Sequence, residues 1–469
     1  MENQIEKILC IEVLEKISRM RRYLFSHYSS SKTEGKEVVG LFLNSLNAIQ
    51  GNLESLIKYI KSTDQFNPYE KATVSRRISN VFLTFIQLHE QLQLIYGEWV
   101  RPETHTFLNE ILEFFPFERR QSKINVVLTN DYMFFESNLT WLFSAILNNN
   151  DIAPHSAEEN PTVFLPKIDH DNPLNWTILA HECGHTDAKG IEKLLSNPKL
   201  LSTEITGNIK IIFENWVEEI YCDLIATKTL GPAYLASFCT FVLLISGIEG
   251  NELSNKTHPS NVLRINLIQE YLESRNIKIP LKTSIGGNSD LSSYYYFMVE
   301  NYNETSRKYL NPDSFQDSPN IDTTVLLDTI SEEVDDIINF NFTLTKEDFK
   351  RIDSLKERLS KGITIASFQD VEKLREAQNR YPKEKVELRD LNEAKESLQE
   401  RRAKLWEIIN TGWINKIENI IPSAIQLFFE NEECLFTEKM EILSNVLQKN
   451  DSILLKSIES SEIFKIMEG

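Results

Sequence analysis

Glycine and proline are scarce in this chain, with 15 of each among 469 residues. Both residue types punctuate turns, so their scarcity argues against a turn-rich β architecture and favours long helices. The hydrophobic residues make up 41% of the chain, which is ample for a buried core. The composition therefore predicts a globular, mainly helical protein.

Cysteine is rarer still. The five cysteines are scattered, odd in number and free of C-x-x-C spacing, which favours reduced thiols and a cytoplasmic location. The first seven residues, MENQIEK, carry acids where a secretory signal needs a basic start and an apolar core. No export signal is therefore expected.

Long apolar runs are missing as well. The longest, Ala233 to Gly247, is interrupted by hydroxyl side chains and falls short of the roughly 20 residues that cross a bilayer, so it predicts a buried core helix.

Basic residues are outnumbered by acidic ones, so the net charge is −19 and the isoelectric point is near 5.0. Such a balance repels phosphate backbones and anionic lipid surfaces, so neither nucleic acid nor a membrane is expected as a partner.

Histidine is rare, with eight in the chain, yet two of them lie four residues apart in the segment HECGH at residues 181–185. On a helix this spacing places His181 and His185 on one face, close enough to bind one metal ion. Glu182 then projects about 100° away, beside the open position of the metal. This is the H-E-x-x-H pattern of zinc peptidases.

The flanking residues predict that this motif lies on a helix. Asp171 is a capping residue and Pro173 is placed at the first helical position, whereas Asp187 to Gly190 has the composition of a helix end. Cys183 lies two residues from each histidine and points to another helix face, so it is expected to pack rather than to bind the metal.

Two histidines and a water leave a four-coordinate site incomplete, so a third protein ligand is expected on another helix, with a carboxylate behind a histidine. Glu219 and Asp223 share one face of an apolar helical segment that lies 219 − 185 = 34 residues beyond His185. We predict that Glu219 binds the metal and that Asp223 orients a histidine, His181 in the first place. The alternatives are a solvated acidic edge, or Glu218 as the ligand, although Glu218 has no acidic partner four residues later.

Together the patterns H-E-x-x-H and E-x-x-x-D resemble those of the gluzincin group of zinc metallopeptidases, whose third ligand is a glutamate on a downstream helix. Residues 257–265, THPSNVLRI, are similar to the His-Pro-plus-arginine segment of the HtpX-like and CAAX-prenyl endopeptidases. The resemblance covers about residues 160–270 and implies a zincin-like core. Those relatives are embedded in membranes, and this chain has no span to match, so their membrane substrates are not expected here.

The same segment contains His258, a candidate second catalytic residue. A peptidase stabilises the oxyanion that forms opposite the zinc, and a histidine or tyrosine donor is the usual means. The alternative is that His258 caps a helix begun by Pro259, with Arg264 pairing a carboxylate. If His258 is not the donor, the next candidates are the tyrosines at positions 294, 295 and 296.

Elsewhere the chain shows helical periodicity, apart from two short β-branched segments at residues 123–129 and 162–168 that predict strands. Pro166 in the second segment predicts a sheet edge, which makes this strand a candidate shelf for an extended substrate or, alternatively, a plain edge strand. The basic residues 18–22 and 401–402 lie in amphipathic patterns and predict solvated helix faces. The apolar stripe at residues 406–414 predicts docking onto the rest of the protein.

We therefore expect a mainly α protein of the α+β kind, with a zincin-like core and small β-sheet at residues 121–275. A helical N-terminal region (1–120) precedes this core, and a connecting segment (276–321) leads to a helical C-terminal region (322–469). The expected function is a zinc metallopeptidase, a hydrolase in which His181, His185 and Glu219 bind Zn²⁺ and Glu182 is the general base acting on a peptide or protein substrate. The alternative is a non-catalytic helical interaction protein with a structural zinc site, although structural sites usually have four protein ligands.

Overall fold

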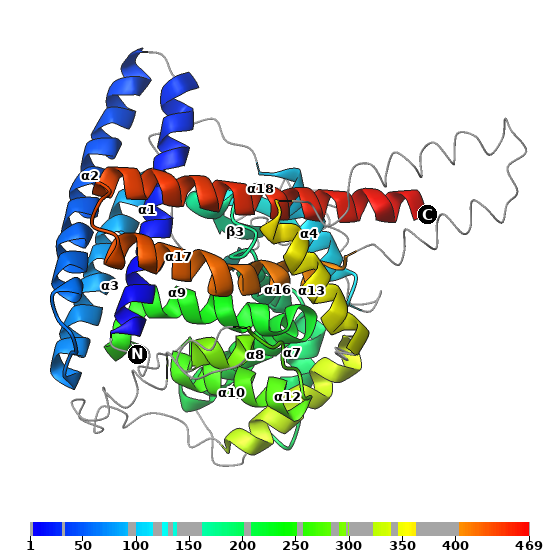
Figure 1. The fold of residues 1–469 in the computed structure, drawn as a ribbon. Helices are drawn as coiled ribbons and strands as arrows, with labels where there is room; N and C mark the ends of the chain where they lie inside the picture. Colours follow the sequence, from blue (N-terminus) through cyan, green and yellow to red (C-terminus); the bar gives the residue numbers. More distant parts are fainter. Residues whose placement is uncertain are drawn as a thin grey trace, which may run out of the picture.

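The structure is a computed structural model that describes residues 3–30, 33–91, 100–115, 124–129, 135–137, 162–200, 208–250, 257–282, 290–296, 299, 322–338, 346–362 and 403–468. Helices occupy most of these ranges, and the strands form one small sheet (Figure 1). The mainly helical fold with a small sheet, predicted from composition and periodicity, is confirmed. The domain boundaries drawn from the sequence stay a prediction.

The elements follow one another along the chain in three groups. The N-terminal helices are α1 (Gln4–Ser30), α2 (Thr33–Lys61), α3 (Pro68–Glu90) and α4 (Pro102–Leu112). The middle group comprises β1 (Asn125–Thr129), β2 (Phe135–Ser137), β3 (Thr162–Pro166), the 3-10 turn η2 (Lys167–Asp169), α6 (Thr177–His185), α7 (Ala188–Leu195), α8 (Asn208–Leu230), α9 (Pro232–Gly250) and α10 (Asn261–Ser274). The C-terminal group comprises α12 (Thr323–Ile337), α13 (Lys346–Ser360), α16 (Leu405–Asn415), the π-helical turn η4 (Lys416–Ile420), α17 (Ile421–Ile425), the π-helical turn η5 (Gln426–Glu430) and α18 (Phe436–Glu468).

The three described strands are ordered β1-β3-β2, with β1 parallel and β2 antiparallel to β3. The strand that contains Pro166 is therefore the central one, and its predicted edge position is wrong. Pro166 is tolerated because it is the last residue of β3, opposite Thr129 of β1, whereas the register of β2 begins at Phe164. A central strand has both sides occupied, so β3 is not the expected shelf for a substrate.

The helical rod from Leu405 to Glu430 is the centre of the C-terminal region. Every residue of α16 is buried, and this helix packs against α9, α13 and α18, so the predicted docking of residues 406–414 is confirmed. The rod contains two π-helical turns, and the first ends two residues before Pro422. Proline has no N–H to donate and its ring crowds the preceding turn, which accounts for the widened turn at this place.

One polar face of α1 is buried, contrary to the solvated face predicted for residues 18–22. Arg19 is 3% exposed and pairs with Glu15 on its own helix and with Asp451 on α18. Lys16 pairs with Asp169 of η2 at 3.0 Å. The face is buried because α1 packs between η2 and α18, and these elements supply carboxylates that compensate Lys16 and Arg19. Residues 401–402 lie outside the described residues.

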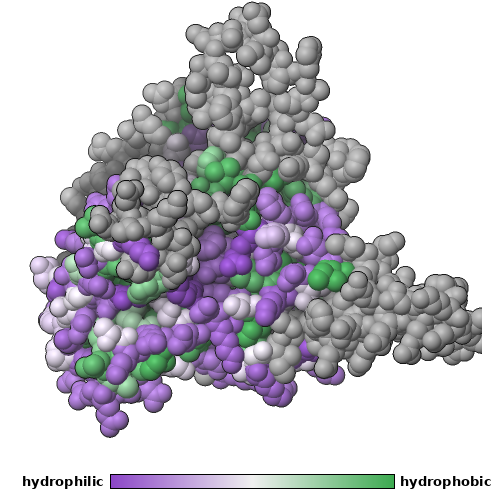
Figure 2. Space-filling model, turned by 90° about the horizontal axis from the view of Figure 1, so that it is seen from above, coloured by the Kyte–Doolittle hydropathy of each residue, from purple (hydrophilic) through white to green (hydrophobic). Residues whose placement is uncertain are grey.

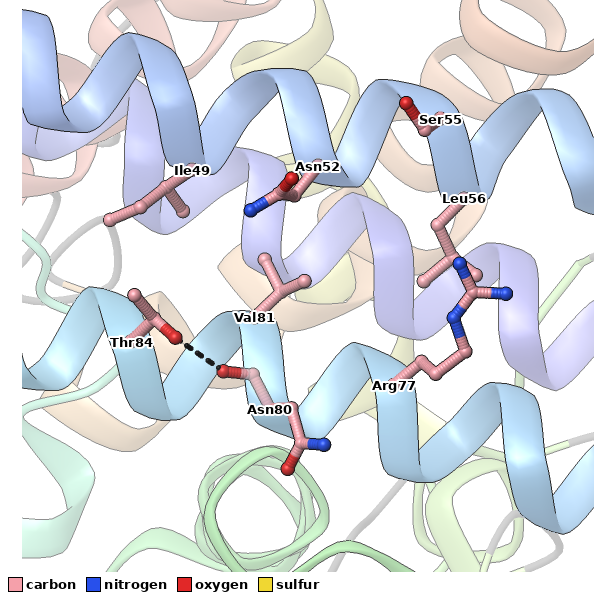
Figure 3. Close-up of a pocket in the computed structure, with 8 residues that line it drawn as sticks. All are labelled: Ile49, Asn52, Ser55, Leu56, Arg77, Asn80, Val81 and Thr84. Carbon is pink, nitrogen blue, oxygen red and sulfur yellow. Dashed lines mark hydrogen bonds between the residues drawn. The ribbon is translucent and has the colours of Figure 1, made fainter.

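A single cluster of buried hydrophobic side chains extends from Ile5 to Ile458, so helices from all three groups share one core. On the face seen in Figure 2, the described surface is largely hydrophilic, with hydrophobic residues in small scattered patches. A shallow cavity of about 290 Å³ lies between α2 and α3, lined by residues such as Asn52 and Arg77 (Figure 3). None of the helices in the described ranges is long and apolar enough to span a membrane.

Candidate metal centre

The motif helix α6 begins later than the sequence predicts. Its first residue is Thr177, Trp176 is at the N-cap, and no side chain caps it. The preceding turn is instead built around the buried carboxylate of Asp169, which accepts hydrogen bonds from the side chains of Asn172 and Asn175. The predicted helix end is also displaced, since α6 stops at His185 and Asp187 caps the next helix, α7.

Helix α6 lies against α8 at very short range, and Gly184 permits this approach. A Cβ atom at Gly184 would lie 2.9 Å from the Cα, Cβ and Sγ atoms of Cys222 on α8. Such a distance is not tolerated between carbon atoms, so a larger residue would push the two helices apart. Cys183 is fully buried, which confirms the expectation that it packs in the core.

The close approach brings His181 and His185 of α6 to Glu219 of α8. Their Nε2 atoms lie 3.3 Å from each other. The His181 Nε2 atom is 3.4 Å from Glu219 Oε2, and the His185 Nε2 atom is 3.7 Å from Glu219 Oε1. One ligand atom from each residue thus falls within 4.8 Å of the others, and no comparable group occurs elsewhere in the described part of the chain.

The Nδ1 atom of each imidazole lies within hydrogen-bond distance of a carboxylate. His181 Nδ1 lies 2.9 Å from Asp223 Oδ1, as the sequence predicts, and His185 Nδ1 lies 2.9 Å from Glu218 Oε1. An Nδ1–H that donates to a carboxylate leaves the Nε2 lone pair free for a metal ion. Glu218 is therefore part of the site, but it binds the Nδ1 side of His185 and is not one of the metal ligands.

Arg264 balances the negative charge of this group. Its guanidinium donates to both oxygens of Asp223 at 2.7 Å each and lies 3.3 Å from Glu219 Oε2. Burial raises the pKa of the Glu219 carboxyl, but Arg264 and then His181 outweigh it and bring that pKa down to about 2. The same balance holds the pKa of Asp223 well below its usual range. Both carboxylates are therefore ionised at neutral pH and attract a cation.

Glu182, the predicted general base, is 7% exposed. Burial raises the pKa of its carboxyl, while the neighbouring His181 and His185 lower it. The net effect is an increase, which moves the group towards the range in which a carboxylate can accept and return a proton near neutral pH.

His258 lies at the rim of the centre. Its Nε2 atom is 3.4 Å from Glu219 Oε1, and its side chain is 47% exposed. Helix α10 begins at Asn261 and is capped by the hydroxyl of Ser260, so the alternative role of His258 as a helix cap is wrong. The structure thus brings His258 next to Glu219, one of the predicted metal ligands. By contrast, Tyr294 and Tyr295 are fully buried in the core, where they pack against each other and Tyr295 also packs against Trp413.

The residues present fit a divalent metal ion. Glu219 Oε2 is buried and pairs with the charge of Arg264 at 3.3 Å, but it accepts no hydrogen bond from the described residues, so it can still bind a metal ion. Two imidazoles and one carboxylate are the donor set that zinc takes in catalytic sites with an open position. The chain therefore contains a candidate metal site of the His-His-Glu class.

Three features of the site were not predicted from the sequence: the close approach at Gly184, the role of Glu218, and the hydroxyl of Tyr234 on α9, which donates to Asp223. The sequence separation between His185 and Glu218 does not predict their contact, and no residue pattern around Tyr234 indicates that it reaches the site.

Comparison of the chain with protein-family models, with curated proteins and with solved structures finds no match. The assignment of the site therefore depends on its geometry.

Proposed function

We propose that the protein is a zinc-dependent metallopeptidase. The observation that supports this most directly is the convergence of His181, His185 and Glu219, within 4.8 Å of one another, beside a buried Glu182 on the same helix. A structural zinc site needs ligands and no general base, whereas a hydrolytic site needs both.

Bound zinc would supply Lewis acidity and lower the pKa of a water molecule towards 7. The protein residues would do the rest. His181, His185 and Glu219 hold the ion, while Glu218 and Asp223 keep the two imidazoles in the tautomer that presents Nε2. Glu182 accepts a proton from the attacking water and returns it to the leaving amine, and His258 donates a hydrogen bond to the oxygen of the attacked peptide carbonyl.

The substrate we propose is a peptide or protein in the cytoplasm. All five cysteines are free thiols, and four of them are buried, which supports a reducing compartment. The membrane substrates of the enzymes that the motifs resemble are not part of this proposal.

The decisive experiment compares the wild-type protein with Glu182→Gln and with Glu214→Gln as a matched control. Glu214 lies on α8, near Lys210 and outside the predicted ligand set. We expect all three proteins to bind one zinc ion, and Glu182→Gln alone to lose most cleavage of a peptide mixture, because an amide of similar size cannot accept the proton.

A non-catalytic helical protein with a structural zinc site is the second candidate. Its support is the low exposure of the ligands, since the side chains of His181 and Glu219 are 7% and 11% exposed. One zinc bound per chain with no cleavage by the wild-type protein would establish this second function and exclude the first.

A further inference from the structure

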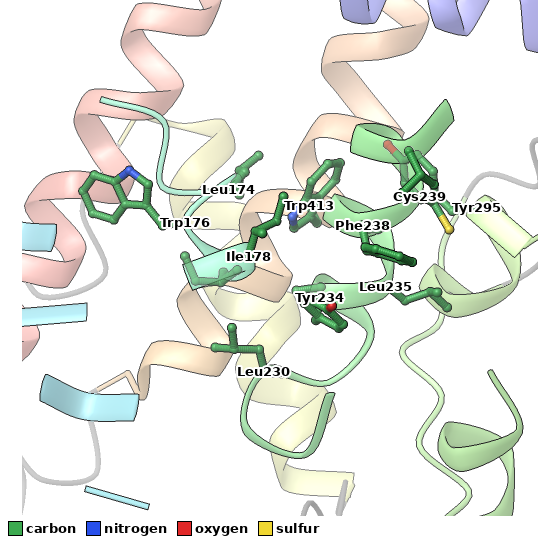
Figure 4. Close-up of a cluster of buried hydrophobic side chains, with 14 of the residues drawn as sticks. Leu174, Trp176, Ile178, Leu230, Tyr234, Leu235, Phe238, Cys239, Tyr295 and Trp413 are labelled. Carbon is green, nitrogen blue, oxygen red and sulfur yellow. The ribbon is translucent and has the colours of Figure 1, made fainter. Parts of the chain in front are cut away.

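A tyrosine hydroxyl lies next to the hydrogen-bonded pair formed by His181 and Asp223. Tyr234 belongs to α9 and is fully buried. Its hydroxyl donates a hydrogen bond to Asp223 Oδ1 and lies 3.3 Å from His181 Nδ1. The phenol ring is within 6° of parallel to the imidazole of His181. It also stacks on Phe238, one turn further along α9 (Figure 4). The tyrosine therefore contacts both His181 and Asp223.

The hydroxyl matters because Asp223 has competing partners. Arg264 approaches both oxygens of this carboxylate in a bidentate pair, which fixes the plane of the carboxylate relative to the guanidinium and not relative to the imidazole. The second donor on Oδ1, from Tyr234, comes from a different helix and from the side of His181. It restrains the carboxylate in the orientation that His181 Nδ1 requires.

Tyr234 is itself held by the C-terminal region. It follows the corner between α8 and α9, where Gly231 has a φ of 65°. The side chain of Asn410, on α16, bridges this corner by donating to the carbonyl of Leu230 at 2.7 Å and accepting from the N–H of Ala233 at 3.0 Å. Asn410 is fully buried, so no water competes for these bonds.

We propose that Tyr234 is a positioning residue of the metal centre, which orients His181 through Asp223, and that Asn410 holds Tyr234 in place from the C-terminal region. This inference rests on the proposed metal site and extends it beyond the two sequence motifs. It assigns the C-terminal helices a part in metal binding, although they contribute no ligand.

The test is Tyr234→Phe, which removes one oxygen atom and keeps the ring. Tyr271→Phe is a matched control, because the Tyr271 hydroxyl also donates to a carboxylate, Asp335, which is likewise paired with an arginine, Arg275, at a different place in the fold. Zinc affinity is measured by competition with a chromophoric chelator. Tyr234→Phe is expected to raise the Kd for zinc on the order of 10-fold, within the range found for outer partners of ligands, and Tyr271→Phe to leave it unchanged.

Two further measurements separate positioning from general destabilisation. Loaded with Co²⁺ in place of zinc, Tyr234→Phe should show shifted visible absorption bands, because the coordination geometry changes, whereas Tyr271→Phe should match the wild type. Asn410→Ala keeps Tyr234 but removes the two hydrogen bonds that hold the corner between α8 and α9. It is therefore also expected to raise the Kd for zinc.

Wild-type zinc affinity and an unchanged Co²⁺ spectrum in both Tyr234→Phe and Asn410→Ala would overturn the proposal. Failure of the wild-type protein to bind one zinc ion would instead refute the proposed function, and the two failures are thus distinguishable. None of these measurements depends on peptidase activity.

Discussion

Replacing Gly184 by alanine tests whether the approach of α6 to α8 sets the metal geometry. The new Cβ would lie 2.9 Å from three atoms of Cys222, whereas ordinary van der Waals contact is 3.4–4 Å. The deficit is 3.4 − 2.9 = 0.5 Å at least and 4 − 2.9 = 1.1 Å at most. Two of the three atoms are the Cα and Cβ of Cys222, so a rotation of the thiol cannot relieve the contact, and the helices must separate.

The energetic consequence has two parts. Overpacking costs about 1–3 kcal/mol, and alanine in place of glycine returns about 1 kcal/mol of helix propensity, so the net destabilisation is about 0–2 kcal/mol. Metal sites tolerate ligand distances within about ±0.2 Å, and a helix shift of 0.5 Å or more exceeds that tolerance. We therefore expect Gly184→Ala to weaken zinc binding on the order of 10–100-fold.

The assay combines urea unfolding of the metal-free protein with zinc competition against a chelator. Gly51→Ala is the control, because among the described residues no atom outside the local backbone of α2 lies within 4 Å of a Cβ at this position. That substitution should leave zinc affinity unchanged and stabilise the protein by about 0.4–1 kcal/mol. If Gly184→Ala matched the wild type in both unfolding and zinc affinity, the glycine would have no part in forming the site.

Three other predictions follow from the site and its surroundings. Glu218→Ala and Asp223→Ala should each weaken zinc binding on the order of 10–100-fold, whereas Glu218→Gln, which keeps an acceptor for His185, should retain most of the affinity; equal losses in Ala and Gln variants would count against the hydrogen bond. His258→Phe should lower kcat on the order of 10²–10³-fold with little change in KM or zinc content, and an unaffected kcat would remove His258 from oxyanion binding. Of the five cysteines, Cys434 is the one that is not buried, and burial raises the pKa of each of the other four thiols, so titration of the folded protein with a thiol reagent should find one fast thiol per chain.

The placement of the candidate ligands was largely predictable because it follows from spacing within helices. Four-residue separations place His181 with His185 and Glu219 with Asp223 on common faces wherever the helices pack. The ends of α6 were not predicted, since Trp176 precedes the helix without any capping hydrogen bond and the turn before it is organised by Asp169. That arrangement depends on a buried carboxylate and leaves no local composition signal.

Long-range contacts decided the remaining differences. Pro166 lacks an N–H, so it predicts a strand that is not hydrogen-bonded along its whole length on both sides. The order of strands depends on which segments meet in space, however, and β3 pairs with both β1 and β2. The charges of α1 would be solvated in an isolated amphipathic helix. They are buried because Lys16 and Arg19 find carboxylates 153 and 432 residues away, and a sequence window of helical length contains neither partner.

The buried pair between Arg19 and Asp451 has a consequence for how the protein is made. During synthesis at roughly 5–20 residues per second, the arginine leaves the ribosome on the order of 20–90 seconds before its aspartate, because 432 residues separate them. Until then α1 cannot be buried as it is in the finished protein, and its apolar side chains remain available to chaperones and to other nascent chains. Lys16 on the same helix pairs with Asp169 in the turn before α6, so the packing of α1 also affects the segment that leads to His181. A chain that ends before α18 should therefore contain the complete H-E-x-x-H motif but bind zinc more weakly than a chain that includes α18.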